Sequence, residues 1–284
     1  MKSKFRHYWS LIKSLQTGLL LTTGLAGYMS ARCPVFNLPF LLGVGASLFL
    51  AISGSTVLNM WYDRDLDAKM ERTCWRPLPS GNITPREALI FGLFISAIGI
   101  GFALWLDLLF GVIVFAGLFF DVVVYTIWLK RRTAWSNLWG GISGGMPILA
   151  GRVAGMGEIE WVGIALSLAV IFWIPTHTLT FSMRYHLDYQ RAGIPTFPIL
   201  YGFDGTRKIL AVTSILAGVA MVISAVGIGI SIGFLRLISF LSLGLLILAG
   251  SSYFKPSEKM NFGLFKFASV YMLIAMLLFA FDGM

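Results

Sequence analysis

The chain has 284 residues, 57% of them hydrophobic and only 12% charged, with a mean hydropathy of +0.80 and a formal net charge of +9. This composition excludes an ordinary soluble domain, and the sequence does not show the alternating polarity of membrane barrel strands. Because lipid offers no hydrogen-bond partner to a free backbone amide, we expect an all-α, polytopic membrane protein that forms one domain over residues 1–284.

Apolar runs of about 20 residues, long enough to cross a bilayer as helices, follow one another along the chain. About nine spans are predicted, at residues 11–30, 39–60, 86–105, 107–129, 136–156, 161–183, 206–228, 232–250 and 262–281. No small-residue cleavage site follows the basic N-terminus, so we interpret the first run as a retained span. The only substantial connections are 61–85 and 184–205, and the first ends where Thr84 and Glu87 can form a capping box.

The basic residues predict the orientation. If the N-terminus is cytoplasmic, 19 of the 22 lysines and arginines fall on that side, and only Arg32, Arg152 and Arg236 fall outside. Since positive residues concentrate in cytoplasmic loops, we expect both long connections to be cytoplasmic and the C-terminus to lie outside the cell membrane. Because the cytoplasmic loops account for the net positive charge, we do not expect a nucleic-acid partner. Cys33 and Cys74 then lie on opposite sides, which argues against a disulfide.

The first long connection begins with a row of oxygen-bearing side chains. Asn59, Asp63 and Asp67 are four residues apart, which places them one turn apart on one helix face. Carboxylates in such a row repel one another unless they share a cation, and hard oxygen ligands beside a phosphate favour Mg²⁺. We therefore predict a Mg²⁺–phosphate site. The alternative is a solvated helix end, and that interpretation suits Asp65 better than it suits the row.

Basic side chains near the acidic row could neutralise a metal-bound diphosphate. Arg72 and Arg76 follow the row directly, and Lys130 opens the next inner connection. Arginine presents a planar fork that matches phosphate oxygens. The alternative is that these residues are ordinary bases of inner loops.

Two ionisable residues fall within predicted spans, where such groups usually face a cavity or a partner. For Asp121 we favour an interhelical hydrogen bond. For His177 two interpretations stay open, a binding role and a contact with a neighbouring backbone group. Nearer the surface, Asp188 is the only acid in the stretch RYHLDYQRAGIPTFP of the second long connection. It could hold a second metal ion opposite the acidic row or form a simple surface pair with an arginine.

Longer motifs make the sequence similar to a known family. Asn59, Asp63 and Asp67 form an NxxxDxxxD motif, and DRDLDAKMERTCWRPLPSG, YTIWLKRRTAWSNLWGGISGGMPILAG and DYQRAGIPTFPI occur in order. Over roughly residues 10–210 the chain resembles the heme-prenylating branch of the UbiA superfamily of intramembrane prenyltransferases. The resemblance implies nine helices around a central cavity, capped by two acidic loops. The second motif offers only Asp188, where many members have two aspartates.

The resemblance also implies roles for individual residues. The catalytic, Mg²⁺-binding set would be Asn59, Asp63, Asp67 and Asp188. The diphosphate would contact Arg72, Arg76, Lys130, Arg131 and Lys13. The acceptor pocket would include Tyr125, Asn137 and His177. Lys13 occupies the place of a base in the first helix, although this chain lacks the proline that usually follows it.

The implied reaction moves a farnesyl group from farnesyl diphosphate to a vinyl group of heme B within the lipid bilayer, with Mg²⁺ as cofactor. The implied partners of such an enzyme include heme A synthase or the assembly of a terminal oxidase. Two alternatives stay open. The acceptor could be a quinone precursor or a glycerol phosphate ether, or the chain could be a non-catalytic transporter of heme or lipid. Pro147 and Pro175 could break helices as in transporters, but the clustered acids favour an enzyme.

Overall fold

The computed structural model describes residues 2–31 and 37–282, and every regular element in these ranges is helical, which confirms the predicted all-α class. In chain order the elements are α1 (Lys2–Leu11), α2 (Ser14–Met29), α3 (Leu38–Tyr62), α4 (Arg64–Asp67), α5 (Pro85–Leu106), α6 (Leu108–Leu118), η1 (Phe119–Leu129), α7 (Ser136–Met156), α8 (Trp161–Arg184), α9 (His186–Arg191), α10 (Phe197–Ile228), α11 (Ile232–Phe254) and α12 (Glu258–Asp282). Cys33, and with it the predicted separation of the two cysteines, lies outside the described residues.

Seven segments of the described chain are long and apolar enough to cross a membrane, so the protein is a multi-pass membrane protein. The predicted number of about nine is not reached by this measure. The helix α2 has only 16 residues, which is short for a full crossing, and α7 carries polar Asn137 and Arg152 among many glycines.

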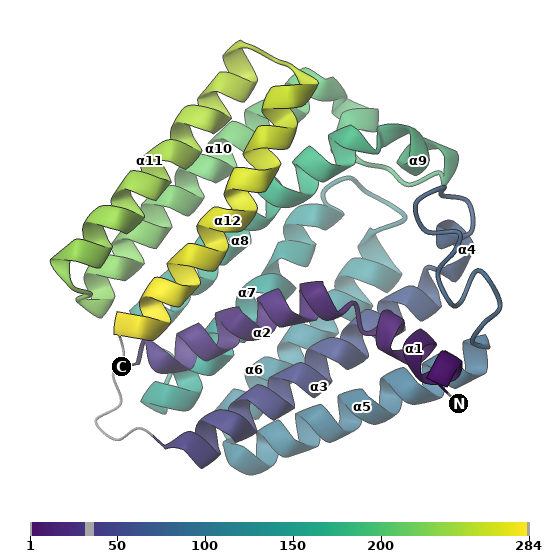
Figure 1. Cartoon of the computed structure of the whole chain (residues 1–284), viewed down its shortest axis with the longest axis horizontal. Coiled ribbons are helices and arrows are strands. Elements are labelled where there is room, and N and C mark those ends of the chain that lie inside the picture. Colours follow the sequence, from purple (N-terminus) through teal and green to yellow (C-terminus); the bar gives the residue numbers. More distant parts are fainter. Residues whose placement is uncertain (1, 32–36, 283–284) are drawn as a thin grey trace.

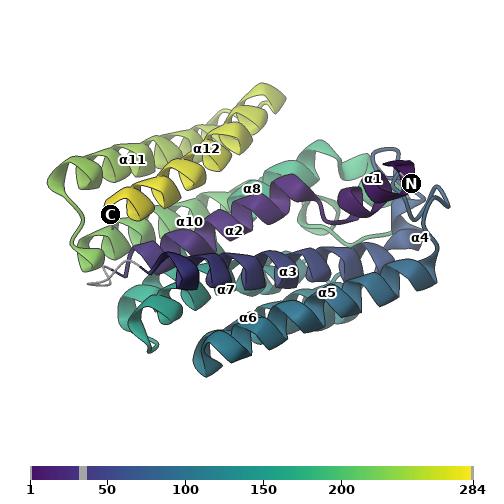
Figure 2. The ribbon, with the colours of Figure 1, turned by 60° about the horizontal axis from the view of Figure 1, so that its bottom comes forward.

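The helices form two groups that meet at α2 and α7 (Figures 1 and 2). One apolar core joins α2, α3, α5, α6 and α7, and a larger one joins α7, α8, α10, α11 and α12. The contact between α2 and α7 is close because glycines face it from both sides. A Cβ atom on Gly27 or Gly151 would collide with the backbone of the opposite helix. Small residues at helix contacts are typical of membrane bundles, as expected from the composition.

The short helices α1, α4 and α9 gather at one end of the bundle, whereas α12 ends at the opposite end (Figure 1). The loop after α4 ends at the predicted capping box. The Thr84 hydroxyl accepts a hydrogen bond from Glu87 N, and the Glu87 carboxylate accepts one from Thr84 N. This part of the sequence prediction is confirmed.

Two predicted spans begin just after a bend of the backbone. The span predicted at 11–30 corresponds to α2, which begins at Ser14 after a bend at Lys13, whose φ of 50° lies in the left-handed region. The span predicted at 206–228 corresponds to the part of α10 that follows a kink at Gly202, where φ is 69°. Neither Pro147 nor Pro175 breaks its helix, since both lie inside continuous helices.

The fourth predicted span changes its helical type halfway. The helix α6 is a regular α-helix, but η1 is a π-helix of 11 residues. In a π-helix the backbone bonds join residues five apart, so residues with that spacing share a face. Asp121 and Thr126 are five apart, and the Thr126 hydroxyl lies 2.8 Å from the Asp121 carbonyl oxygen. The Asp121 carboxylate and the Thr126 hydroxyl both contact Asn59 of α3.

Candidate active site

The acidic row lies at the end of α3. Asp63 occupies the corner between α3 and α4. The i to i+4 hydrogen bonds nevertheless continue across the corner, from Asp63 N to Asn59 O at 2.9 Å and from Asp67 N to Asp63 O at 2.8 Å. Asn59, Asp63 and Asp67 thus keep the predicted helical spacing. Both aspartates are buried, with 5% and 6% of their surface exposed.

Each buried aspartate of the row is paired with a cation. Lys130 Nζ forms an ion pair with Asp63 Oδ2. Arg76 Nη1 donates to both carboxylate oxygens of Asp67, at 2.9 and 2.8 Å. Burial lowers the pKa of Lys130, but nearby Tyr125 and Asp63 raise it more, and the net shift is upward. These pairs satisfy carboxylates that would be very costly to bury alone.

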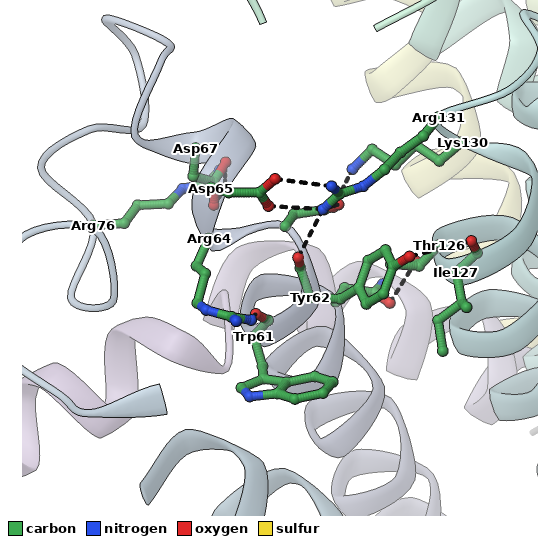
Figure 3. A network of polar contacts seen from close by, with 12 residues as sticks. Trp61, Tyr62, Arg64, Asp65, Asp67, Arg76, Thr126, Ile127, Lys130 and Arg131 are labelled. Atoms are coloured by element: carbon green, nitrogen blue, oxygen red, sulfur yellow. Dashed lines mark hydrogen bonds and ion pairs between the residues drawn. The ribbon is translucent and has the colours of Figure 1, made fainter. Parts of the chain in front are cut away.

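Arg131 binds an acid that the sequence analysis did not include in the site. Its guanidinium forms two parallel hydrogen bonds with Asp65, at 2.8 and 2.7 Å, and a third with the Tyr62 carbonyl oxygen at 2.8 Å (Figure 3). These hydrogen bonds hold the pKa of the Asp65 carboxyl below its ordinary value. Arg131 also lies 3.8 Å from Asp63. The residues after η1 are thereby fixed to the corner between α3 and α4.

Deeper in the bundle, Asp121 connects η1 to α3. Its Oδ2 atom accepts hydrogen bonds from Asn59 Nδ2 at 2.8 Å and from the Ser55 hydroxyl. The Thr126 hydroxyl lies 2.7 Å from Asn59 Oδ1. The interhelical hydrogen bond predicted for Asp121 is confirmed, and its partner is the first residue of the NxxxDxxxD row.

Lys13 lies at the bend between α1 and α2. The Ile12 carbonyl oxygen accepts hydrogen bonds from Thr17 at 2.7 Å and from Thr56 of α3 at 3.1 Å, which fixes the bend to α3. Burial, together with the charges of Arg76 and Lys130, lowers the pKa of Lys13 to about 8. Left-handed backbone outside glycine is uncommon and is often found at functional sites.

The two polar connections pack against each other. Leu66 and Met70 of the first form an apolar cluster with Ala192 and Ile194 of the second. An ion pair between Arg191 and Glu71 joins the same connections. Asp188 is 8% exposed and lies 3.9 Å from Arg191. Its predicted pairing with a neighbouring arginine is therefore present, and the metal role stays a prediction.

Arg72 differs from the other predicted diphosphate contacts. Its guanidinium lies over the rings of Phe181 and Tyr185, at 4.9 and 5.6 Å from their centres. Its Nε atom is buried and has no hydrogen-bond partner among the described residues. Arg72 thus connects the first loop to the end of α8, with one donor still free.

The residues predicted for the acceptor pocket lie on three different helices, η1, α7 and α8. The Nζ atom of Lys130 lies over the ring of Tyr125, 5.6 Å from the ring centre. Asn137 is partly buried in the first turn of α7. His177 of α8 lies between the rings of Trp173 and Phe265, with centres 5.2 and 4.5 Å away. Its Nδ1 atom is 3.1 Å from the Ser269 hydroxyl, so its partner is a side chain and not a backbone group.

Within the described chain, no group of three His, Cys, Asp or Glu side chains is close enough to share a metal ion. Asp63 and Asp67 instead face cations. The donor set nevertheless fits a hard divalent ion, because it consists of oxygens and because Asp63 Oδ1 is buried with no hydrogen-bond partner among the described residues. Exchange of the cationic partners for a metal ion would satisfy that oxygen.

Comparison with known proteins identifies the family of the chain. The model of the UbiA prenyltransferase family matches residues 20–280. The chain belongs to the UbiA prenyltransferase family. A protoheme IX farnesyltransferase of Archaeoglobus fulgidus is 45% identical over 202 residues, which cover 71% of this chain and 70% of the relative. Another, of Desulforudis audaxviator, is 35% identical over 276 residues, 95% and 86% of the two chains.

Solved UbiA structures share the fold. A structure concerned with digeranylgeranylglyceryl phosphate synthase superposes with a TM-score of 0.82 at 21% identity and covers 99% of both chains. A UbiA homolog from Archaeoglobus fulgidus bound to GPP and Mg²⁺ superposes with a TM-score of 0.72 at 16% identity, covering 96% of this chain and 99% of that one. At these identities the comparison establishes the UbiA fold alone.

Proposed function

We propose that the protein transfers a farnesyl group from farnesyl diphosphate to a vinyl group of heme B and so forms heme O and diphosphate. The names of the relatives at 35–45% identity support this activity. The observation in the structure that carries it is the buried Asp63–Lys130 and Asp67–Arg76 pairs at one end of the bundle. They place anionic metal ligands and cationic phosphate ligands side by side.

Asn59, Asp63, Asp67 and Asp188 would hold Mg²⁺, which supplies Lewis-acid stabilisation of the departing diphosphate when bound. Lys130 and Arg76 would leave their aspartates and contact the diphosphate oxygens, with Arg131, Lys13 and the free donor of Arg72 nearby. The bond between farnesyl C1 and the diphosphate oxygen breaks, and its electrons leave with diphosphate. A vinyl carbon of heme B bonds to C1, and the resulting cation takes up water and loses a proton.

The apolar bundle would keep water away from the farnesyl cation until the acceptor reacts. His177, between two aromatic rings, offers a flat apolar surface suited to a heme plane, and Tyr125 and Asn137 would line the path from the diphosphate. Because both donor chain and heme are amphipathic, a site inside the membrane allows both to enter from lipid.

We further propose that the end containing α4 and α9 faces the cytoplasm in the cell membrane. The distribution of 19 of 22 lysines and arginines supports this orientation. Heme O would remain in the bilayer, so an enzyme that modifies it next, such as heme A synthase, or an assembling terminal oxidase would receive it there.

The test uses membranes that contain the protein, heme B, farnesyl diphosphate and Mg²⁺, with the mass of the heme followed over time. We expect a heme that is heavier by one farnesyl group and one hydroxyl group. Asp63→Ala should abolish turnover while the protein remains inserted. Asp204→Ala, which removes an exposed aspartate on α10, should remain active. Prenylation of a phenolic acceptor but not of heme would refute the proposed acceptor.

A further inference from the structure

Asn59 is held by two side chains, and a third binds one of these two; no part of the proposed reaction uses any of the three directly. Its Nδ2 atom donates to Asp121 at 2.8 Å, and the Thr126 hydroxyl lies 2.7 Å from its Oδ1 atom. Ser55 donates to the same Asp121 oxygen. Ser55 and Thr126 are buried, with 6% and 0% of their surface exposed. The amide of Asn59 is thus enclosed by fixed partners from α3 and η1.

We propose that Asp121 is a positioning residue that orients the Asn59 amide and strengthens its oxygen as a ligand for the divalent ion. An ionised carboxylate has no proton and can only accept hydrogen bonds. Asp121 therefore binds the amide nitrogen of Asn59, and the Oδ1 atom of Asn59 points away from Asp121. An amide oxygen has two lone pairs, and the Thr126 hydroxyl occupies only one of them. The second remains for a metal. This inference rests on the proposed metal–diphosphate site.

The expected electronic effect follows from the same hydrogen bond. An amide whose N–H group donates to a carboxylate carries more negative charge on its oxygen. Carboxylates that bind metal-ligating histidines act in this way, and loss of such outer partners typically weakens metal binding about 10- to 100-fold. The positive charge of Lys13 interacts favourably with the carboxylates of Asp67 and Asp121.

The π-helical turn makes this arrangement possible. Asp121 and Thr126 are five residues apart, and both contact the same asparagine. On a regular α-helix residues five apart point in different directions. The geometry of η1 therefore serves to place an acceptor and a hydroxyl on either side of one amide.

The experiment measures binding of Mn²⁺ in the presence of inorganic pyrophosphate to the purified full-length protein, with free Mn²⁺ counted by electron paramagnetic resonance. Neither heme nor prenyl transfer enters this measurement. We expect Asp121→Leu and Asn59→Ala each to raise the Kd of Mn²⁺ by about 10-fold or more. The double variant should bind no worse than Asn59→Ala, because Asp121 acts through Asn59.

Asp121→Asn is the second variant, because it keeps an acceptor and the shape of the side chain while it removes the charge. The Kd of Mn²⁺ for Asp121→Asn should lie between the values for wild type and for Asp121→Leu. Ser214→Ala removes another buried interhelical hydrogen bond, to Thr176 at 2.8 Å, and should leave the Kd unchanged. Thermal unfolding confirms that each variant is folded.

Independent effects that multiply in the double variant would overturn the inference, and so would wild-type Mn²⁺ binding by Asp121→Leu or Asn59→Ala. A non-additive cycle in a protein that does not prenylate heme would support the inference and refute the proposed acceptor instead.

Discussion

Replacement of Lys130 by methionine should make the protein bind a divalent ion more tightly when no diphosphate is present. In the structure a metal ion must displace Lys130 from Asp63 before it can use that carboxylate. Two unit charges about 4 Å apart interact by about 4 kcal/mol at an effective dielectric constant of about 20. Ordering the lysine side chain costs about 2 kcal/mol of this. The net obstacle is then about 2 kcal/mol, or about 30-fold in affinity.

The assay compares the Kd of Mn²⁺ alone, measured by electron paramagnetic resonance, with the Kd of pyrophosphate in saturating Mn²⁺. Lys130→Met should lower the Kd of Mn²⁺ alone by about 10- to 30-fold. It should raise the Kd of pyrophosphate, because the diphosphate loses a contact. The control is Arg132→Met, which removes the same charge from an exposed neighbour in the same loop. It should change the Kd of Mn²⁺ much less.

Mn²⁺ affinity that is unchanged or weaker in Lys130→Met would refute this reasoning, since the lysine would then not compete with the metal. Equal gains in Lys130→Met and Arg132→Met would also refute it, because they would show a general effect of net charge and not exchange at Asp63.

Lys13 provides a prediction about pH. Its pKa is lowered from 10.5 to about 8 in the folded protein. Between about pH 8 and pH 10.5 the unfolded chain therefore binds more protons than the folded protein does. The unfolding temperature of the ligand-free protein should therefore rise with pH from about 8 to 10.5, and a wild-type slope in Lys13→Met would contradict this assignment. His177→Ala should weaken heme binding by about 2- to 10-fold through loss of ring stacking, measured by heme absorbance titration. Mn²⁺–pyrophosphate binding should not change in that variant, and equal loss of both would indicate a purely structural role.

The helices and the acidic row were predictable because their causes are local. Apolar runs of sufficient length predict spans wherever they occur. The capping box at Thr84 and Glu87 depends on chemistry within four residues, and the spacing of Asn59, Asp63 and Asp67 depends on helical geometry alone. The capping box and the spacing of the acidic row were found where the sequence placed them.

The backbone irregularities were not predictable from the same signals. Lys13 adopts a left-handed conformation that lysine does not favour, and it does so because Ile12 O is held by Thr17 and by Thr56 on another helix. The π-helix at Phe119–Leu129 has the same apolar composition as an α-helical span would have. Both features depend on contacts between elements, which a pattern along one segment does not contain.

The pairing of the bases shows why a sequence could indicate this site without assigning its residues. Lys130, Arg131 and Arg132 are consecutive and equally suited to an inner loop, yet they face Asp63, Asp65 and solvent, respectively. The difference comes from how the end of η1 is placed against the corner between α3 and α4. In that placement the cations that neutralise the carboxylates are the ones a diphosphate would need. Binding of metal and of diphosphate should therefore favour each other, because each supplies the partner that the other displaces.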